Sequence, residues 1–160
     1  MAAQTSRWSF LFRADEGRID AGTWWRNTGV LFAIFAVLTL VWLLVEPYAK
    51  HDLATEPLFT FPILAANLYR IFYGFASVVL LICYYNLSAK RWRDLGHPAA
   101  LAGILPFFAC VTAALHWLEP RVGGEIPHFV VIIADILLFL TLLWNVIDLG
   151  SLLDAFRRRN

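Results

Sequence analysis

The sequence predicts an all-α, polytopic membrane protein in which four transmembrane helices form one bundle. Three observations predict this fold class. Hydrophobic residues make up 60% of the 160 residues, whereas about half is usual in soluble domains. They gather in four runs with almost no charge, at residues 27–45, 63–85, 99–118 and 127–149. At about 1.5 Å per helical residue, each run is long enough to cross a hydrocarbon core about 30 Å thick.

The basic residues predict the orientation of these helices. Ten of the 13 Lys and Arg residues precede the first run, separate the second run from the third, or follow the fourth. Those three segments share one side of a four-span topology, and positively charged segments face the cytoplasm. Both termini are therefore expected to be cytoplasmic, with Trp24, Trp25 and Trp92 at the inner interface.

This topology divides the chain into three parts. Residues 1–26 mix aromatic and charged side chains and are expected to form a cytoplasmic interfacial segment. Residues 27–149 form the transmembrane domain, and residues 150–160 form a basic cytoplasmic tail. Because Glu46 and Pro47 follow the first run in place of a small-residue cleavage site, the first helix is expected to remain as an anchor.

Prolines and glycines mark the ends and irregularities of the later spans. Pro62 suits the first turn of the second span. Pro106, about seven residues into the third run, is expected to kink that helix. A short turn rich in Pro and Gly at residues 119–126 makes the third and fourth spans antiparallel neighbours.

Two charged residues inside the spans, Arg70 and Asp135, are the sharpest candidates for a functional site. Each lies roughly 10–12 Å from the outer end of its run, so both are expected at a similar depth. An unpaired charge there costs about 2.5–3.5 kcal/mol, which pairing would offset. They could form a structural ion pair, line a proton or ion pathway, or never meet. Other residues that could line such a path are Tyr73, Ser77, His116 and His128.

Other chemistry has little support in the sequence. His116 and His128 could in principle be axial ligands of a haem, but two histidines alone do not predict one, and no cofactor is predicted. Cys83 and Cys110 lack metal-ligand spacing, so no metal site is expected. No nucleophile, Walker or metalloprotease motif appears, so the sequence does not predict an enzyme. No segment outside the spans is large enough to fold as a nucleic-acid reader.

Two segments carry a pattern that resembles a known family. The run of residues 17–20 followed by Trp24 and Trp25, and the run of residues 90–96, resemble the entry signature and the second loop of domain of unknown function 805. Ala21 and Arg93 depart from that pattern, where the family often has Arg and His. The resemblance implies a multi-span protein of the bacterial inner (cytoplasmic) membrane, in a family whose activity is unassigned.

The charged residues of these two segments are expected to meet at the cytoplasmic surface of the membrane. One interpretation is a salt-bridged belt that joins the N-terminal segment to the second loop. The other is a site for a lipid head group, a phosphate-bearing ligand or a partner protein. The residues concerned are Arg18, Asp20, Lys90, Arg91, Arg93 and Asp94.

Size and composition favour a protein that acts by association. The first hypothesis is a small integral membrane protein that serves as an accessory subunit of a membrane complex or forms a homo-oligomer. The alternative is a small transporter or channel with a polar path along Arg70 and Asp135. The expected partners are the lipid bilayer, anionic lipids, and other membrane subunits or the chain itself.

Overall fold

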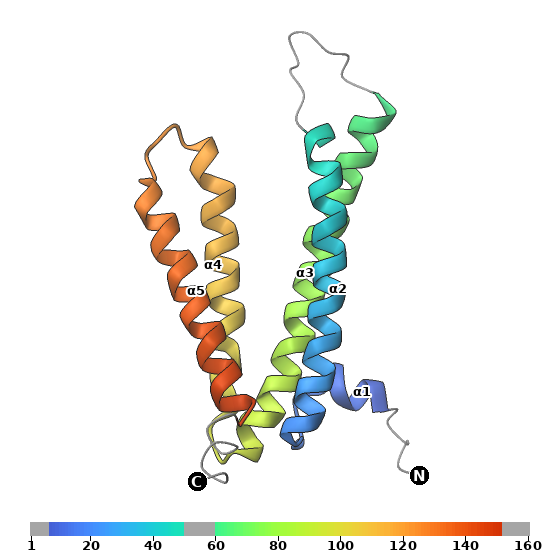
Figure 1. Cartoon of the computed structure of the whole chain (residues 1–160), viewed down its shortest axis with the longest axis vertical. Helices are drawn as coiled ribbons and strands as arrows, with labels where there is room; N and C mark the ends of the chain where they lie inside the picture. Colours follow the sequence, from blue (N-terminus) through green and yellow to red (C-terminus); the bar gives the residue numbers. More distant parts are fainter. Residues whose placement is uncertain (1–6, 50–59, 152–160) are drawn as a thin grey trace.

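A computed structural model describes residues 7–49 and 60–151, and this part of the chain is helical with short connecting segments (Figure 1). Four segments are long and apolar enough to cross a membrane. The all-α fold class is confirmed, and the four helices are those of a multi-pass membrane protein. In chain order the elements are α1 (Arg7–Phe12), α2 (Ala21–Ala49), α3 (Phe61–Asp94), η1 (Ala99–Gly103), α4 (Ile104–Leu118), η2 (Glu119–Arg121) and α5 (His128–Leu149).

The four long helices form two antiparallel hairpins, α2 with α3 and α4 with α5 (Figure 1). The hairpins meet at one end, where α1 and the ends of α3 and α5 come together. This end is called the base. From there the hairpins separate toward the opposite, distal end (Figure 1). The predicted bundle is therefore closed at the base only. The prediction that the third and fourth spans are antiparallel neighbours is confirmed.

Helix α3 extends beyond the run that predicted it. Its 34 residues measure about 51 Å, well over the thickness of a hydrocarbon core. Residues 90–94, expected in a loop, form the last turns of this helix. The helix stops because Gly96, at φ +79°, allows its own N–H and that of His97 to bond the carbonyls of Arg93 and Trp92.

Two prolines, Pro62 and Pro106, lie in the first turns of long helices. Pro62 lies in the first turn of α3, as predicted. Pro106 was expected to kink the third span, but it lies in the first turn of α4, because residues 99–103 form the separate 3₁₀ turn η1. Proline is tolerated in a first turn, where its missing N–H has no helical partner. Pro106 therefore marks the start of α4 and does not kink it.

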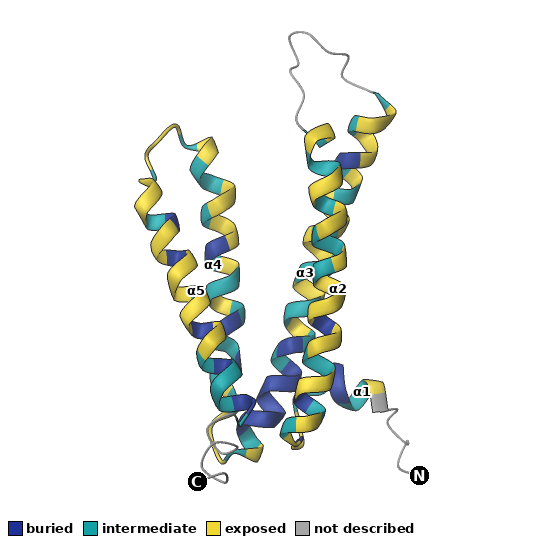
Figure 2. Cartoon of the chain, in the orientation of Figure 1, coloured by how far each residue is buried: buried dark blue, intermediate teal, exposed yellow. Residues whose placement is uncertain are grey.

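Burial is concentrated at the base (Figure 2). Distally, the hairpins expose many large apolar side chains, among them Phe32, Phe75 and Phe139. Such a surface is unusual for a soluble protein and suits contact with lipid. The apolar core at the base includes Leu11, Phe12, Ile19, Trp24, Leu87, Trp92 and Leu149.

Candidate functional site

The base is organised around Lys90, whose side chain is 0% exposed. Its Nζ donates to the main-chain carbonyls of Leu11 at 3.4 Å, of Ala14, and of Asn86 at 3.1 Å. It also lies 5.2 Å from the centre of the Phe10 ring. A buried cation is costly unless it is paired and hydrogen-bonded. Here three carbonyl oxygens do that, and the expected acidic partner is not among them.

Two further side chains of α3 hold the same N-terminal segment. Asn86 donates to the carbonyl of Phe12 at 2.7 Å. Arg93 donates to the carboxylate of Asp15 at 3.0 Å and to the carbonyl of the same residue. Because that guanidinium favours the charged carboxylate, the pKa of Asp15 is lowered. Residues 86, 90 and 93 share one helical face, so α3 presents a row of donors to the carbonyls of residues 11–15.

The turn between α1 and α2 depends on Gly17. Its φ is +97°, and a Cβ atom at this position would lie 2.7 Å from the Phe10 ring. A side chain would therefore be strained there and would also displace the ring that covers Lys90. Gly17 therefore has a structural role in this turn.

Asp20 begins α2. Its carboxylate accepts from the N–H of Thr23 at 3.1 Å and from the Thr23 hydroxyl at 2.6 Å. These bonds lower the pKa of Asp20, since they favour the ionised form. Asp20 therefore acts as a helix cap and makes no ion pair with the predicted belt. Arg18 is exposed and has no ion pair within the part of the chain that the structure describes.

Arg91 joins the two hairpins. Its Nε donates to the carbonyl of Leu149 at 2.9 Å, and its terminal nitrogens donate to Ser151 and Asp94. The last carbonyls of a helix have no partner within the helix and attract cations. Arg91 satisfies one of them at the end of α5. Of the predicted belt, Arg91 and Arg93 form ion pairs, the first with Asp94 and the second with Asp15.

Tryptophans complete the base. Trp24 was expected at the membrane interface, but it is 1% exposed and donates from Nε1 to the hydroxyl of Ser88 at 3.3 Å. Trp25 donates to the carbonyl of Gly150 at 3.3 Å, which links α2 to the end of α5. Trp92 is also buried, with its ring 5.2 Å from that of Trp144. Trp24 and Trp92 therefore pack inside the protein at the base.

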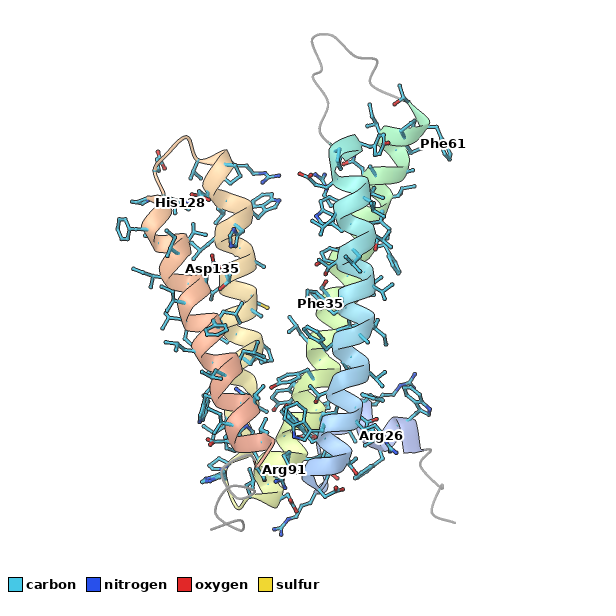
Figure 3. All side chains as sticks on the ribbon, in the orientation of Figure 1. Arg26, Phe35, Phe61, Arg91, His128 and Asp135 are labelled. Atoms are coloured by element: carbon cyan, nitrogen blue, oxygen red, sulfur yellow. The ribbon has the colours of Figure 1, made fainter. Side chains whose placement is uncertain are left out.

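In the distal half, Asp135 pairs with His116. Nε2 of His116 on α4 lies 2.9 Å from Oδ1 of Asp135 on α5, and the two side chains are 54% and 47% exposed. Figure 3 shows Asp135 between the two helices of this hairpin. Side chains lean toward the N-terminus of their own helix. Thr112 donates to the carbonyl of Ala134, so His116 lies nearer the distal end than Asp135. In two antiparallel helices, the side chains of His116 and Asp135 therefore lean toward each other.

The structure does not bring Arg70 and Asp135 together. The Arg91–Leu149 bond marks one height on α3 and α5. Arg70 lies 21 residues from Arg91, about 31 Å along α3, whereas Asp135 lies 14 residues from Leu149, about 21 Å along α5. Measured along the helices from this bond, Arg70 lies about 10 Å farther from the base than Asp135. Arg70 is exposed and lies on the other hairpin.

The other residues of the predicted polar path bond within their own hairpins. Tyr73 on α3 lies 3.0 Å from the hydroxyl of Thr39 on α2, and Ser77 donates to the carbonyl of Tyr73 at 2.8 Å. His128 on α5 bonds Glu119 through Nδ1. Each of the two histidines considered for haem thus already engages a carboxylate. Among the described residues, no group of three His, Cys, Asp or Glu could hold a metal ion.

Comparison with known proteins adds no relative. No family model, no curated protein and no solved structure matches this chain. The function is therefore argued from the two features described above. One is a base that fastens the N-terminal segment and both hairpins together. The other is a carboxylate–imidazole pair on the exposed distal surface of α4 and α5.

Proposed function

We propose that this chain is a small integral membrane protein that acts by association, either as an accessory subunit of a membrane complex or as a homo-oligomer. One observation carries the proposal: the two hairpins are fastened at the base, and the His116–Asp135 pair is left about half exposed on the distal surface. Polar groups at membrane depth usually face other protein or a water-filled cavity. A partner that covers this pair would meet that requirement.

We further propose that the base faces the cytoplasm of a bacterial cell, which places the protein in the inner membrane with both termini inside. Exposed arginines around the base support this orientation, because basic segments stay on the cytoplasmic side. The resemblance to domain of unknown function 805 supports the same address. These exposed cations also suit contact with anionic lipid head groups. They are Arg13, Arg18 and Arg26.

A second function, as a proton-coupled transporter or channel, is favoured by the same pair. A carboxylate bonded to an imidazole inside a membrane can accept and release a proton. Four spans would need a second copy to enclose a path, so this function also requires association. It predicts that Asp135→Asn abolishes proton flux into liposomes while the protein remains folded. Arg70 is the control, since it lies on the other hairpin: Arg70→Gln should leave the flux unchanged.

Native mass spectrometry of the full chain, extracted in a mild detergent from its own membrane, tests the association. A stoichiometric larger complex that contains other proteins supports the accessory-subunit form of the proposal. A defined homo-oligomer supports the other form. A lone monomer over a range of mild detergents contradicts both.

A further inference from the structure

The surface of α4 beside His116 combines small side chains with a polar pair. Ala109, Ala113 and His116 follow one stripe of α4, at spacings of four and three residues. Ala113 and His116 are exposed, and Ala109 is partly buried. On α3, in contrast, the exposed residues include Ile71, Phe72, Phe75, Val78 and Ile82. Bulky residues suit lipid chains, whereas small residues allow another helix to approach closely.

The His116–Asp135 pair next to this stripe has unused hydrogen-bonding capacity. Nε2 of His116 and Oδ1 of Asp135 bond each other. Nδ1 of the ring and Oδ2 of the carboxylate have no hydrogen bond within residues 7–49 and 60–151. When the imidazole is protonated, Nδ1 is a donor, and the second carboxylate oxygen is an acceptor. The pair therefore offers one donor and one acceptor on the same surface.

From these observations we infer that two copies of this chain associate through the α4 stripe, with His116 of each copy donating to Asp135 of the other. A two-fold interface brings the same patch of both copies together and so must be self-complementary. A patch with one donor and one acceptor meets that condition. The small side chains of Ala109 and Ala113 leave room for the two α4 helices to come close. This inference rests on the proposed function of association and names the partner as a second copy.

Cysteine cross-linking of the full-length protein in its own membrane tests this interface. Replacing Cys83 and Cys110 by serine gives a cysteine-free background, into which Ala113→Cys is introduced. Under mild oxidation this variant is expected to form a disulfide-linked dimer. The control is Phe75→Cys on the lipid-facing surface of α3, which is expected to give little dimer. Equal yields from the two variants, or no dimer with Ala113→Cys, would overturn the interface.

The role of the polar pair is tested in the same cross-linking background. His116→Ala is expected to reduce the dimer yield several-fold, because Asp135 then has no imidazole in either copy. His128→Ala is the matched control, since His128 also bonds a carboxylate but lies about 10 Å farther along α5 than Asp135. The exchanged variant, His116→Asp with Asp135→His, retains both groups and should restore the yield. An unchanged yield in His116→Ala would contradict the pairing across the interface.

Native mass spectrometry separates this inference from the proposed function. A complex with other proteins but no Ala113→Cys dimer leaves association intact and rejects the second copy as the partner. A homodimer that does not cross-link at position 113 rejects the α4 stripe as the interface. A monomer that does not cross-link rejects both.

Discussion

The base and the distal half of this protein use polar side chains in opposite ways. At the base, Lys90, Arg91 and Arg93 bond main-chain carbonyls that lie 58 or more residues away in the sequence. In the distal half, polar side chains bond their own helix or the neighbouring helix of the same hairpin. The base therefore determines how the parts of the chain are arranged. The distal half determines only how each hairpin is held together.

This difference has a physical reason. A main-chain carbonyl at a helix end or in a turn has no partner within its own segment, and burial without a partner is costly. Long cationic side chains can reach such carbonyls across several ångströms of apolar surface. Distally, lipid surrounds the helices, and each helix must satisfy its own backbone internally. Few free carbonyls remain there to join one hairpin to the other.

Lys90→Met is the change expected to disturb the base most. It retains the apolar stem but removes the donors to Leu11 and Ala14. Each buried carbonyl that loses its partner costs about 1–3 kcal/mol, so the loss of two is expected to lower the unfolding free energy by about 2–6 kcal/mol. The measurement is denaturant unfolding in detergent micelles, together with trypsin cleavage within residues 7–20. Arg18→Met is the control, because Arg18 is exposed. Equal losses in the two variants would refute a special role for Lys90.

Gly150→Ala tests the contact between the hairpins at the base. A Cβ atom at this position would lie 2.3 Å from the carbonyl oxygen of Val146 and 2.7 Å from the Trp25 ring. Relieving this overlap requires both the end of α5 and the Trp25 ring to shift, and overpacking of this kind costs about 1–3 kcal/mol. Thermal unfolding in detergent measures the loss. The control Gly29→Ala meets nothing within 4 Å and should be neutral or slightly stabilising, because Ala is the better helix former. A neutral Gly150→Ala would show that Trp25 does not fasten α2 to α5.

The sequence predicts the elements of this protein better than it predicts the contacts of their side chains. Four apolar runs suffice to predict four long helices, because hydrophobicity over about 20 residues is a property of a single segment. The partners of Lys90 could not be predicted, since main-chain carbonyls have no signature in the sequence. The spacing of Asn86, Lys90 and Arg93 on one helical face was the available signal.

The partner of Asp135 was missed for a geometric reason. Arg70 and Asp135 lie about equally far from the outer ends of their apolar runs, but the two runs do not end at the same distance from the base. Helix α3 reaches farther from the base than α5, so Arg70 lies above Asp135. His116 could have been preferred to Arg70, because it lies on the antiparallel neighbour of α5. The short turn between α4 and α5 limits which residues can pair more strongly than the distance from the end of a run does.

The Asp15–Arg93 pair is expected to give the smallest effect, and it appears as a dependence of stability on pH. Arg93 lowers the pKa of Asp15 below 3.8 in the folded protein, so the folded state binds this proton more weakly than the unfolded state. The stabilisation is therefore complete above the ordinary pKa of Asp and is lost as the pH falls through the folded-state value.

Asp15→Asn should flatten the acid limb of a plot of unfolding free energy against pH, and Arg93→Gln should flatten it equally. Asp20→Asn is the comparison at the same surface: its carboxylate also has a lowered pKa, but Thr23 causes that shift. Arg93→Gln should therefore leave the contribution of Asp20 in place. Because a solvent-exposed ion pair is screened by salt, the effect of Asp15→Asn should also shrink at high ionic strength. If the acid limb is unchanged in both Asp15→Asn and Arg93→Gln, the base depends on the carbonyl contacts of Arg93 and not on its ion pair.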